Sequence, residues 1–439
     1  MQNHFFGIVD GLRGRLKGEE VLLAGISGER SQFIRFNKSL LRQPGAVDQS
    51  YLSLELVRGQ RHARATISLG GRADDHRRAA ALLKELRGTL DHLSDDPHLL
   101  YSTEVRSTEQ VGEDHLPKAE DAVDAILDAG KGLDLVGLHA QGEVYEGFAN
   151  SFGQRNWFST HSFQFDWSLY LQADKAVKCN YAGLRWDAAE FARKMEWGRQ
   201  QLDVLARPAK TISPGNYRTY LAPSALGDFL GMVAHGGFGL KAHRTKTTVL
   251  LKMVEEGATL SPAVTLTENT HGGIAPNFQS AGFVKPDSVV LVEKGRLANA
   301  LVSPRSAKEY GVPANGASPS EAPESLDVAE GDVPQADVPP RMGSGVYVNS
   351  VWYLNFSDRP GGRITGMTRF ATFWVEDGRI AAPLNVMRFD DTVYRVLGEN
   401  LLGLTREREF LVSTSTYGGR STASVRLPGA MVKDFALTL

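Results

Sequence analysis

The stretch FSTHSFQFDWSLYLQADKAVKCNYAGLRW, residues 158–186, alternates aromatic and polar side chains along most of its length. Successive side chains of a strand point to opposite faces, so this alternation predicts strands with one buried face. The segment from Asp187 to Leu205 is amphipathic and opens with acidic residues, which is typical of a helix. Strands followed directly by such a helix indicate an α+β unit.

The aromatic residues of this stretch have two interpretations. They could line a peptide cleft, but their strand spacing favours packing in the core. The same interpretation applies to a later aromatic group, Trp352, Tyr353 and Phe356. The residues of the first group are Trp157, Phe158, Phe163, Phe165, Trp167 and Tyr170.

The chain on the N-terminal side of this stretch predicts two α+β units. Residues 1–95 hold a helical start, strand-like segments at 21–45, 51–59 and 61–71, and an amphipathic helix from Asp74 to Leu93. The short breaks between these strands favour an antiparallel meander or hairpins. A central domain, residues 96–208, adds a helix from Lys118 to Ala129 and a strand over 133–153 before the aromatic stretch.

The C-terminal part, residues 209–439, is strand-dominated and predicts large mixed or antiparallel sheets, which gives an α+β fold for the whole chain. Tyr217 to Leu221 forms a predicted strand, and Ser224 is the expected N-cap of a helix that runs toward His235. The sequence EDGR at 376–379 is typical of a hairpin turn.

Residues 313–341 interrupt this part with a different composition. They hold six acidic residues, one basic residue at the very end, many prolines and no aromatic residue. Such a segment has little apolar surface to offset the entropy lost on ordering. We therefore expect a disordered acidic loop inside the C-terminal domain, either a variable insertion or a contact for a partner.

Composition excludes several classes of protein. The 439 residues are 42% hydrophobic and 23% charged, with a net charge of −2, which argues against a nucleic-acid binder. Cys179 is the single cysteine, so no internal disulfide or multi-cysteine metal site can form, and a buried inert thiol is expected. We find no signal-peptide or membrane-spanning stretch and expect a cytoplasmic location.

Four segments, in order along the chain, resemble the TldD/PmbA (TldD/TldE) metalloprotease family. They are GERSQFIRFNKSLLRQPG at 28–45, FANSFG at 148–153, DSVVLVEKGRLANALVSPRSAKEYG at 287–311 and FWVEDGRIAAPLN at 373–385. The resemblance implies an assembly of two kinds of subunit. The TldD type is a zinc protease with an H-E-x-x-x-H helix and a distant cysteine ligand, whereas the PmbA/TldE type lacks these groups and helps to enclose an unfolded or modified peptide.

The segment LGDFLGMVAHGGFGLKAH, residues 226–243, decides between the two types. If it occupies the position of the metal-binding helix, His235 matches the second histidine, while Leu230 and Gly231 stand at the first histidine and the glutamate. The late cysteine is also missing from the comparable stretch STSTYGGRST at 413–422. Catalytic zinc needs three protein ligands, and a carboxylate must accept the proton of its water. We therefore assign no catalytic residue.

A rearranged metal site built from His235, His243 and His271 is the alternative for this region. His235 and His243 lie eight residues apart, about 12 Å along a continuous helix, which is too far for both to bind one ion directly. The glycines between them could end the helix and change that distance, but ordinary structural or surface histidines are the preferred interpretation.

These observations predict a non-catalytic PmbA/TldE-like subunit, a degenerate metallopeptidase that pairs with a TldD-type catalytic chain and encloses its peptide. No cofactor is expected in this chain, and zinc is expected in the partner. The alternatives are a stand-alone peptide-binding homodimer and a divergent metallopeptidase with unorthodox ligands. The expected way of holding the peptide is strand addition to a sheet edge, which reads the peptide backbone rather than its sequence.

Overall fold

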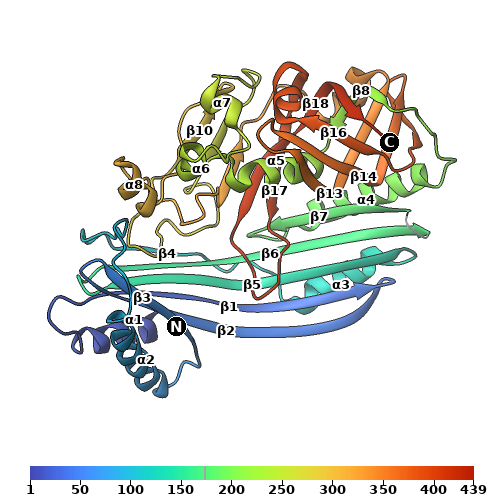
Figure 1. Ribbon diagram of the computed structural model, residues 1–439. Helices are drawn as coiled ribbons and strands as arrows, with labels where there is room; N and C mark the ends of the chain where they lie inside the picture. The colour runs from blue at the N-terminus through green and yellow to red at the C-terminus, as the bar shows by residue number, and fades with distance from the viewer. Residues whose placement is uncertain (173–174) are drawn as a thin grey trace.

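A computed structural model describes residues 1–172 and 175–439, and it confirms the α+β fold (Figure 1). A long seven-stranded sheet occupies the N-terminal half. Its strand order is β3-β2-β1-β5-β6-β4, and β7 pairs with the remaining length of β6. The strands are β1 (Val21–Asn37), β2 (Leu40–Arg58), β3 (Arg61–Leu69), β4 (Thr108–Val111), β5 (Asp134–Asn150), β6 (Arg155–Gln172) and β7 (Lys175–Gly183).

This sheet is continuous across the boundary predicted at residues 95 and 96. Strand β1 pairs antiparallel with β5 from Leu23 opposite Asn150 to Phe36 opposite Gly137. The first and central units therefore share one sheet. Sequence periodicity predicts each strand but not its partner, because pairing depends on residues far apart in the chain.

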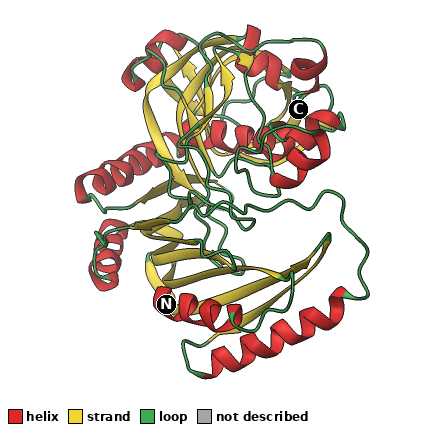
Figure 2. Cartoon of the chain, turned by 90° about the vertical axis from the view of Figure 1, so that its left-hand side faces the viewer, coloured by secondary structure: helices red, strands yellow, loops and turns green. Residues whose placement is uncertain are grey.

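Four helices pack on the seven-stranded sheet. Helices α1 (Gln2–Arg13) and α2 (Asp74–Leu90) bury Phe5 and Leu86 against the strands of the first unit. Figure 2 shows both beneath the sheet, on the side away from the C-terminal domain. Helices α3 (Ala119–Gly130) and α4 (Ala188–Leu205) contribute to a second core with the strands of the central unit.

The aromatic stretch of β6 forms the centre of that second core. Phe163, Phe165 and Trp167 are at most 1% exposed, and Phe165 stacks on Trp167 with ring centroids 4.4 Å apart. Core packing is thus confirmed for the first aromatic group except Tyr170, which is half-buried. In the second group Phe356 is partly buried against the C-terminal core. Core packing is wrong for Trp352 and Tyr353, which are 38% and 80% exposed, because a bulge interrupts the strand alternation there.

An eleven-stranded mixed sheet forms the C-terminal domain, in the order β11-β10-β9-β12-β18-β16-β14-β13-β8. Strand β8 also pairs with β18, so part of the sheet closes on itself, while β15 pairs with β14 and β17 with β18. The strands are β8 (Gly215–Leu221), β9 (Leu266–Glu268), β10 (Val289–Glu293), β11 (Arg296–Leu297), β12 (Ser325–Val328), β13 (Gly345–Asp358), β14 (Arg363–Glu376), β15 (Arg379–Pro383), β16 (Arg388–Thr392), β17 (Leu401–Val412) and β18 (Ser424–Leu437).

Helix α5 (Pro223–Gly237) packs on β13 and β18 and fills the core of this domain. Its N-cap is Ala222, not the predicted Ser224, because Pro223 takes the first helical position, where its fixed φ and missing N–H cost nothing. The predicted turn at 376–379 is confirmed as the hairpin between β14 and β15. The remaining short helices are α6 (Leu240–Arg244), α7 (Leu251–Glu255), α8 (Pro304–Tyr310), α9 (Val338–Met342), a 3₁₀ turn (Gln335–Asp337) and a π turn (Arg395–Glu399).

The prediction of disorder for residues 313–341 is wrong. Strand β12 lies within this segment and pairs parallel with β18 and antiparallel with β9. Its apolar side chains are buried, with Leu326 7% and Val328 2% exposed. An acidic residue of β12, Asp327, accepts a hydrogen bond of 2.6 Å from Arg408. The bulk composition thus did not reveal a short apolar core strand, whose one acidic residue, Asp327, pairs with Arg408 from another part of the chain.

Across residues 1–172 and 175–439, no helix combines the length and the apolar character that crossing a membrane requires.

Candidate functional site

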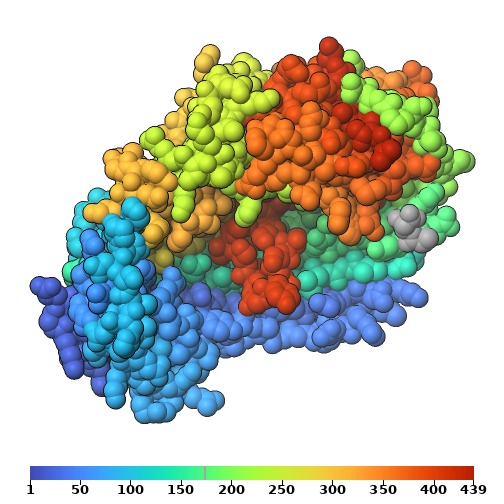
Figure 3. Space-filling model, in the orientation of Figure 1, coloured from blue at the N-terminus to red at the C-terminus, as the bar shows by residue number. Residues whose placement is uncertain are grey.

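Helix α5 and the loop between β17 and β18, residues 413–423, meet at a cavity of about 410 Å³. This central cavity lies between the seven-stranded sheet and the C-terminal domain, and β6 and β7 line its other side. Figure 3 shows the surface hollowed between the two parts, with the β17–β18 loop crossing the hollow. The two stretches that the family resemblance singles out thus contribute to one site.

The face of α5 that lines the central cavity carries small residues and one carboxylate. These residues recur at helical spacing, so they share one side of the helix. They are Ser224, Gly227, Asp228, Gly231 and Ala234. Because glycine and alanine leave the helix backbone uncovered, this side provides room for a ligand.

Leu230 lies on the core-facing side of α5. It is 2% exposed and packs in the core with Leu226, Phe229 and Val233. A side chain at position 230 therefore points away from the central cavity, whereas Gly231 lines it. The sequence already indicated that Leu230 faces the core, because the spacing of the apolar residues at 226, 229, 230 and 233 is typical of a buried helix face.

The three candidate histidines do not come together in a metal site. His235 is exposed and has non-helical dihedral angles at the end of α5, where its carbonyl accepts a 3.3 Å hydrogen bond from Arg359. His243 is buried, and its Nε2 lies 2.7 Å from the Gly237 carbonyl oxygen; burial lowers its pKa. His271 lies exposed in the loop after β9. In the part of the chain that the structure describes, no three His, Cys, Asp or Glu side chains form a metal-binding group.

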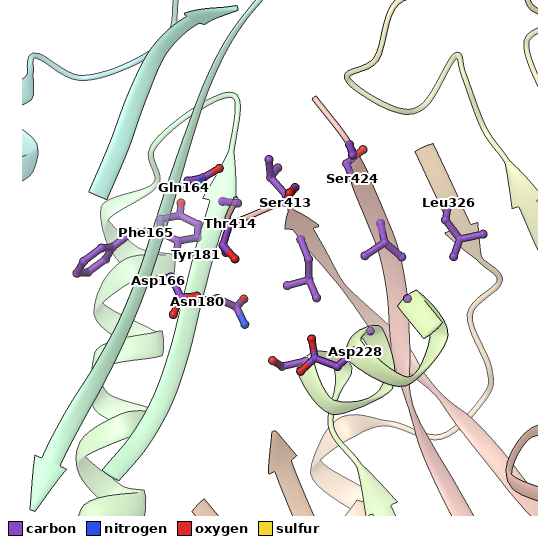
Figure 4. A pocket seen from close by; sticks show the side chains of 18 of the residues that line it. Gln164, Phe165, Asp166, Asn180, Tyr181, Asp228, Leu326, Ser413, Thr414 and Ser424 are labelled. Atoms are coloured by element: carbon purple, nitrogen blue, oxygen red, sulfur yellow. The ribbon is translucent and has the colours of Figure 1, made fainter. Parts of the chain in front are cut away.

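Charged side chains of the central cavity come from three elements (Figure 4). Asp166 of β6 and Lys178 of β7 form an ion pair of 3.6 Å. Burial raises the pKa of Asp166, and Lys178 opposes that shift. Burial also raises the pKa of Asp228 on α5 to about 6; Lys178 lowers it and Asp166 raises it. These three residues carry no recognisable signal in the sequence, because a lone charged residue in a strand or helix does not indicate what it faces.

Arg420 fixes the β17–β18 loop to the seven-stranded sheet. Its guanidinium is buried and donates hydrogen bonds of 2.8 and 2.7 Å to the carbonyl and hydroxyl oxygens of Ser162, and one of 3.1 Å to the Gly142 carbonyl. Its backbone N–H donates to Glu29 at 3.3 Å. Burial lowers the pKa of Arg420 to about 10, and nearby Glu29 opposes the shift. The loop therefore forms a fixed wall of the central cavity.

Cys179 lies in β7, outside the lining of the central cavity. It is 6% exposed, and burial raises the pKa of its thiol, so the thiolate is suppressed. It borders a neighbouring cavity of about 670 Å³ together with α4 and β17. These features agree with the expected buried, inert thiol.

Comparison with known protein families identifies the family of the chain. Residues 214–438, just over half of its length, match the model of the PmbA/TldA metallopeptidase C-terminal domain. The chain belongs to the PmbA/TldD metallopeptidase family. No curated protein sequence matches it significantly.

Solved structures of the family share the whole fold. TldE from Thermococcus kodakarensis superposes with a TM-score of 0.76 at 13% identity, covering 100% of both chains. A candidate modulator of a DNA gyrase from Thermotoga maritima gives 0.78 at 12%, again covering 100% of both chains. A similar protein from Bacteroides thetaiotaomicron gives 0.74 at 15%, covering 99% of this chain and 98% of the other. At these identities the likeness establishes the fold alone.

The central cavity of this PmbA/TldD-family chain does not fit the zinc that the family implies. Catalytic zinc is held by three protein ligands, mostly histidine, cysteine or carboxylate, with an open position for water. The described lining offers the carboxylates of Asp166 and Asp228, and Lys178 already pairs with Asp166. Gly231 and Ala234 on the same helix face carry no donor side chain. We therefore derive no chemical step through a metal in this chain.

Proposed function

We propose that this chain is the non-catalytic, PmbA/TldE-type subunit of a two-chain TldD/TldE-type metallopeptidase. In this proposal it encloses an unfolded or modified peptide, and a TldD-type partner binds the zinc and cuts the peptide. The observation that carries the proposal is the cavity face of α5, where Gly231 and Ala234 stand on the side that faces the opposite sheet. A helix with this face offers space to a peptide rather than ligands to a metal.

Sheet edges beside the central cavity support peptide enclosure. Strand β7 pairs with β6, and β17 pairs with β18, while the other side of β17 is bridged in the described chain at Thr405, to Val333, away from its cavity-lining end at Leu411 and Val412. Residues of both strands line the cavity. An extended peptide can add to such an edge through main-chain hydrogen bonds, which accept many sequences and require an unfolded segment. This mode suits a subunit that admits unfolded chains.

Co-expression with a TldD-type chain tests the proposal. We expect a stable one-to-one complex by size-exclusion chromatography with light scattering, and chelator-sensitive cleavage of unfolded peptides by the complex. The isolated chain should neither cut peptides nor purify with stoichiometric zinc. A homodimer that ignores the TldD-type chain would support the stand-alone peptide binder instead. Zinc-dependent cleavage by the isolated chain, lost on His235→Ala, would establish a divergent metallopeptidase and overturn the proposal.

A further inference from the structure

Among the described residues that line the central cavity, Asp228 is the carboxylate without a charged partner in contact. Within the described chain its carboxylate makes neither a hydrogen bond nor an ion pair, and the charges that act on it, Lys178 and Asp166, do so only at longer range. Figure 4 shows its side chain reaching from α5 into the space opposite β6 and β7. Asp228 is exposed to the solvent that fills the cavity, so its carboxylate is accessible to a cation that enters, and a cation beside it favours its charged form.

The other charges of the cavity leave this site negative. Lys178 lies 3.6 Å from Asp166, so these two groups largely neutralise each other. Asn180, which also lines the cavity, is polar but uncharged. The charge that remains is that of Asp228. An anionic ligand would meet repulsion here, and a cationic group would meet attraction.

The remaining lining selects the kind of cation. Leu326, Leu411 and Val425 provide apolar surface beside the glycine and alanine face of α5. A cation carried on a hydrocarbon stem or a peptide backbone can bury its apolar part on these residues. A hard divalent cation needs six or more oxygen ligands, which one free carboxylate does not supply.

We infer that the central cavity binds a cationic group of a peptide, either an α-ammonium group or the side chain of lysine or arginine, with Asp228 as its counter-ion. The inference rests on the proposed peptide-enclosing function and specifies the chemistry of the peptide that is held. Asp166 is a weaker contributor, because Lys178 already balances its charge. The volume of about 410 Å³ accommodates one such group with its neighbouring backbone.

Fluorescence anisotropy with three labelled hexapeptides tests the inference on the full chain, alone and with the TldD-type subunit. The first peptide has a free N-terminus and no basic side chain. The second is the same peptide N-acetylated, and the third is the acetylated peptide with one lysine. We expect one of the two cationic peptides to bind about tenfold more tightly than the neutral peptide, and the one that does identifies the source of the cation.

Three variants test whether the preference for a cationic peptide depends on Asp228 or on the overall charge of the protein. Asp228→Asn should abolish the preference for the cationic peptide over the neutral one. Asp166→Asn should reduce the preference less. Asp377→Asn, which removes the same charge at an exposed hairpin turn outside the lining of the cavity, should retain it fully. Thermal melts establish that each variant is folded.

Three results would overturn the inference. The first is equal affinity for the neutral peptide and both cationic peptides, and the second is a preference that survives Asp228→Asn. The third is that neither cationic peptide binds, whether to the isolated chain or to the complex. None of these results depends on whether the TldD-type complex assembles and cuts peptides, so the inference and the proposed function can fail separately.

Discussion

The guanidinium of Arg420 donates a 2.7 Å hydrogen bond to Ser162 Oγ, although 258 positions separate the two residues in the sequence. Arg420 belongs to the β17–β18 loop of the C-terminal domain, and Ser162 belongs to β6 of the seven-stranded sheet. This contact joins the two sheets beside the central cavity. Its neighbours, Gly142 and Glu29, accept further hydrogen bonds from the same arginine.

Removing this anchor should loosen the wall of the cavity. Arg420→Met leaves the buried oxygens of Ser162 and Gly142 without their donor, and we expect the free energy of unfolding to fall by about 1–3 kcal/mol. Hydrogen exchange should rise within residues 413–423 more than elsewhere. Arg406→Met, at an exposed position of β17, is the matched control. Unchanged exchange in the loop of Arg420→Met would show that the arginine does not hold it.

Asp228 makes stability depend on pH. Its pKa of about 6 lies above the ordinary aspartate value near 4, so ionisation costs the folded state more than the unfolded state. The free energy of unfolding should therefore fall as the pH rises from about 4 to about 6, and stay lower above that. At about pH 8 we expect Asp228→Asn to be more stable than the wild type by about 1–2 kcal/mol. This value is smaller than the pKa shift alone implies, because water in the cavity screens the charge of Asp228.

Urea denaturation at about pH 3.5 and pH 8 measures this difference, which should vanish at the lower pH because Asp228 is then protonated. Asp377→Asn should follow the wild-type profile. A wild-type advantage over Asp228→Asn at pH 8 would mean that a partner stabilises the carboxylate in the folded protein.

Gly231 and Gly227 form a matched pair on the cavity face of α5. A Cβ at Gly231 would meet no atom within 4 Å, whereas one at Gly227 would lie 3.2 Å from Leu411 Cδ1. Alanine also restricts the unfolded chain, so Gly231→Ala should raise the free energy of unfolding by about 0.4–1 kcal/mol. Gly227→Ala should gain less or lose stability. Differential scanning calorimetry compares them, and a destabilised Gly231→Ala would contradict an open helix face.

Leu230→His tests the orientation of α5. An imidazole at this core position loses buried apolar surface and its polar atoms lack partners, so we expect a loss of about 2–4 kcal/mol. Zinc content, measured by mass spectrometry, should stay below stoichiometric. Gly231→His, which places the ring in the cavity, should cost less. If Leu230→His kept full stability and bound one zinc ion, the side chain at 230 would have to face the cavity.

Local sequence signals predicted the elements of this fold well. The acidic residue at the start of the helix predicted from Asp187 is its N-cap: Asp187 accepts hydrogen bonds from the N–H groups of Ala189 and Glu190 at 2.8 and 3.2 Å. The two-residue turn at Asp377 and Gly378 also follows from local chemistry, since both residues have positive φ. Features of this kind depend on residues a few positions apart.

Features that depend on residues far apart in the chain could not be predicted from the sequence. Tyr353 is exposed because a bulge with a φ of 56° at this residue breaks the alternation of β13. Asp166 and Asp228 reach one cavity only because the C-terminal domain lies against β6 and β7. The family resemblance identified both stretches that meet at this cavity, but the register of α5 required the helix in its packed environment.

Strand β12 has a consequence for shortening the chain. It separates β9 from β18 within the eleven-stranded sheet, so β9, β10 and β11 reach the other strands through these four residues alone along the described strand order. Excising residues 313–341 as dispensable would leave two unpaired edges where β9 and β18 now meet a neighbour. Exposed edges of this kind recruit strands from other molecules. A deletion meant to improve solubility would instead yield a protein that aggregates.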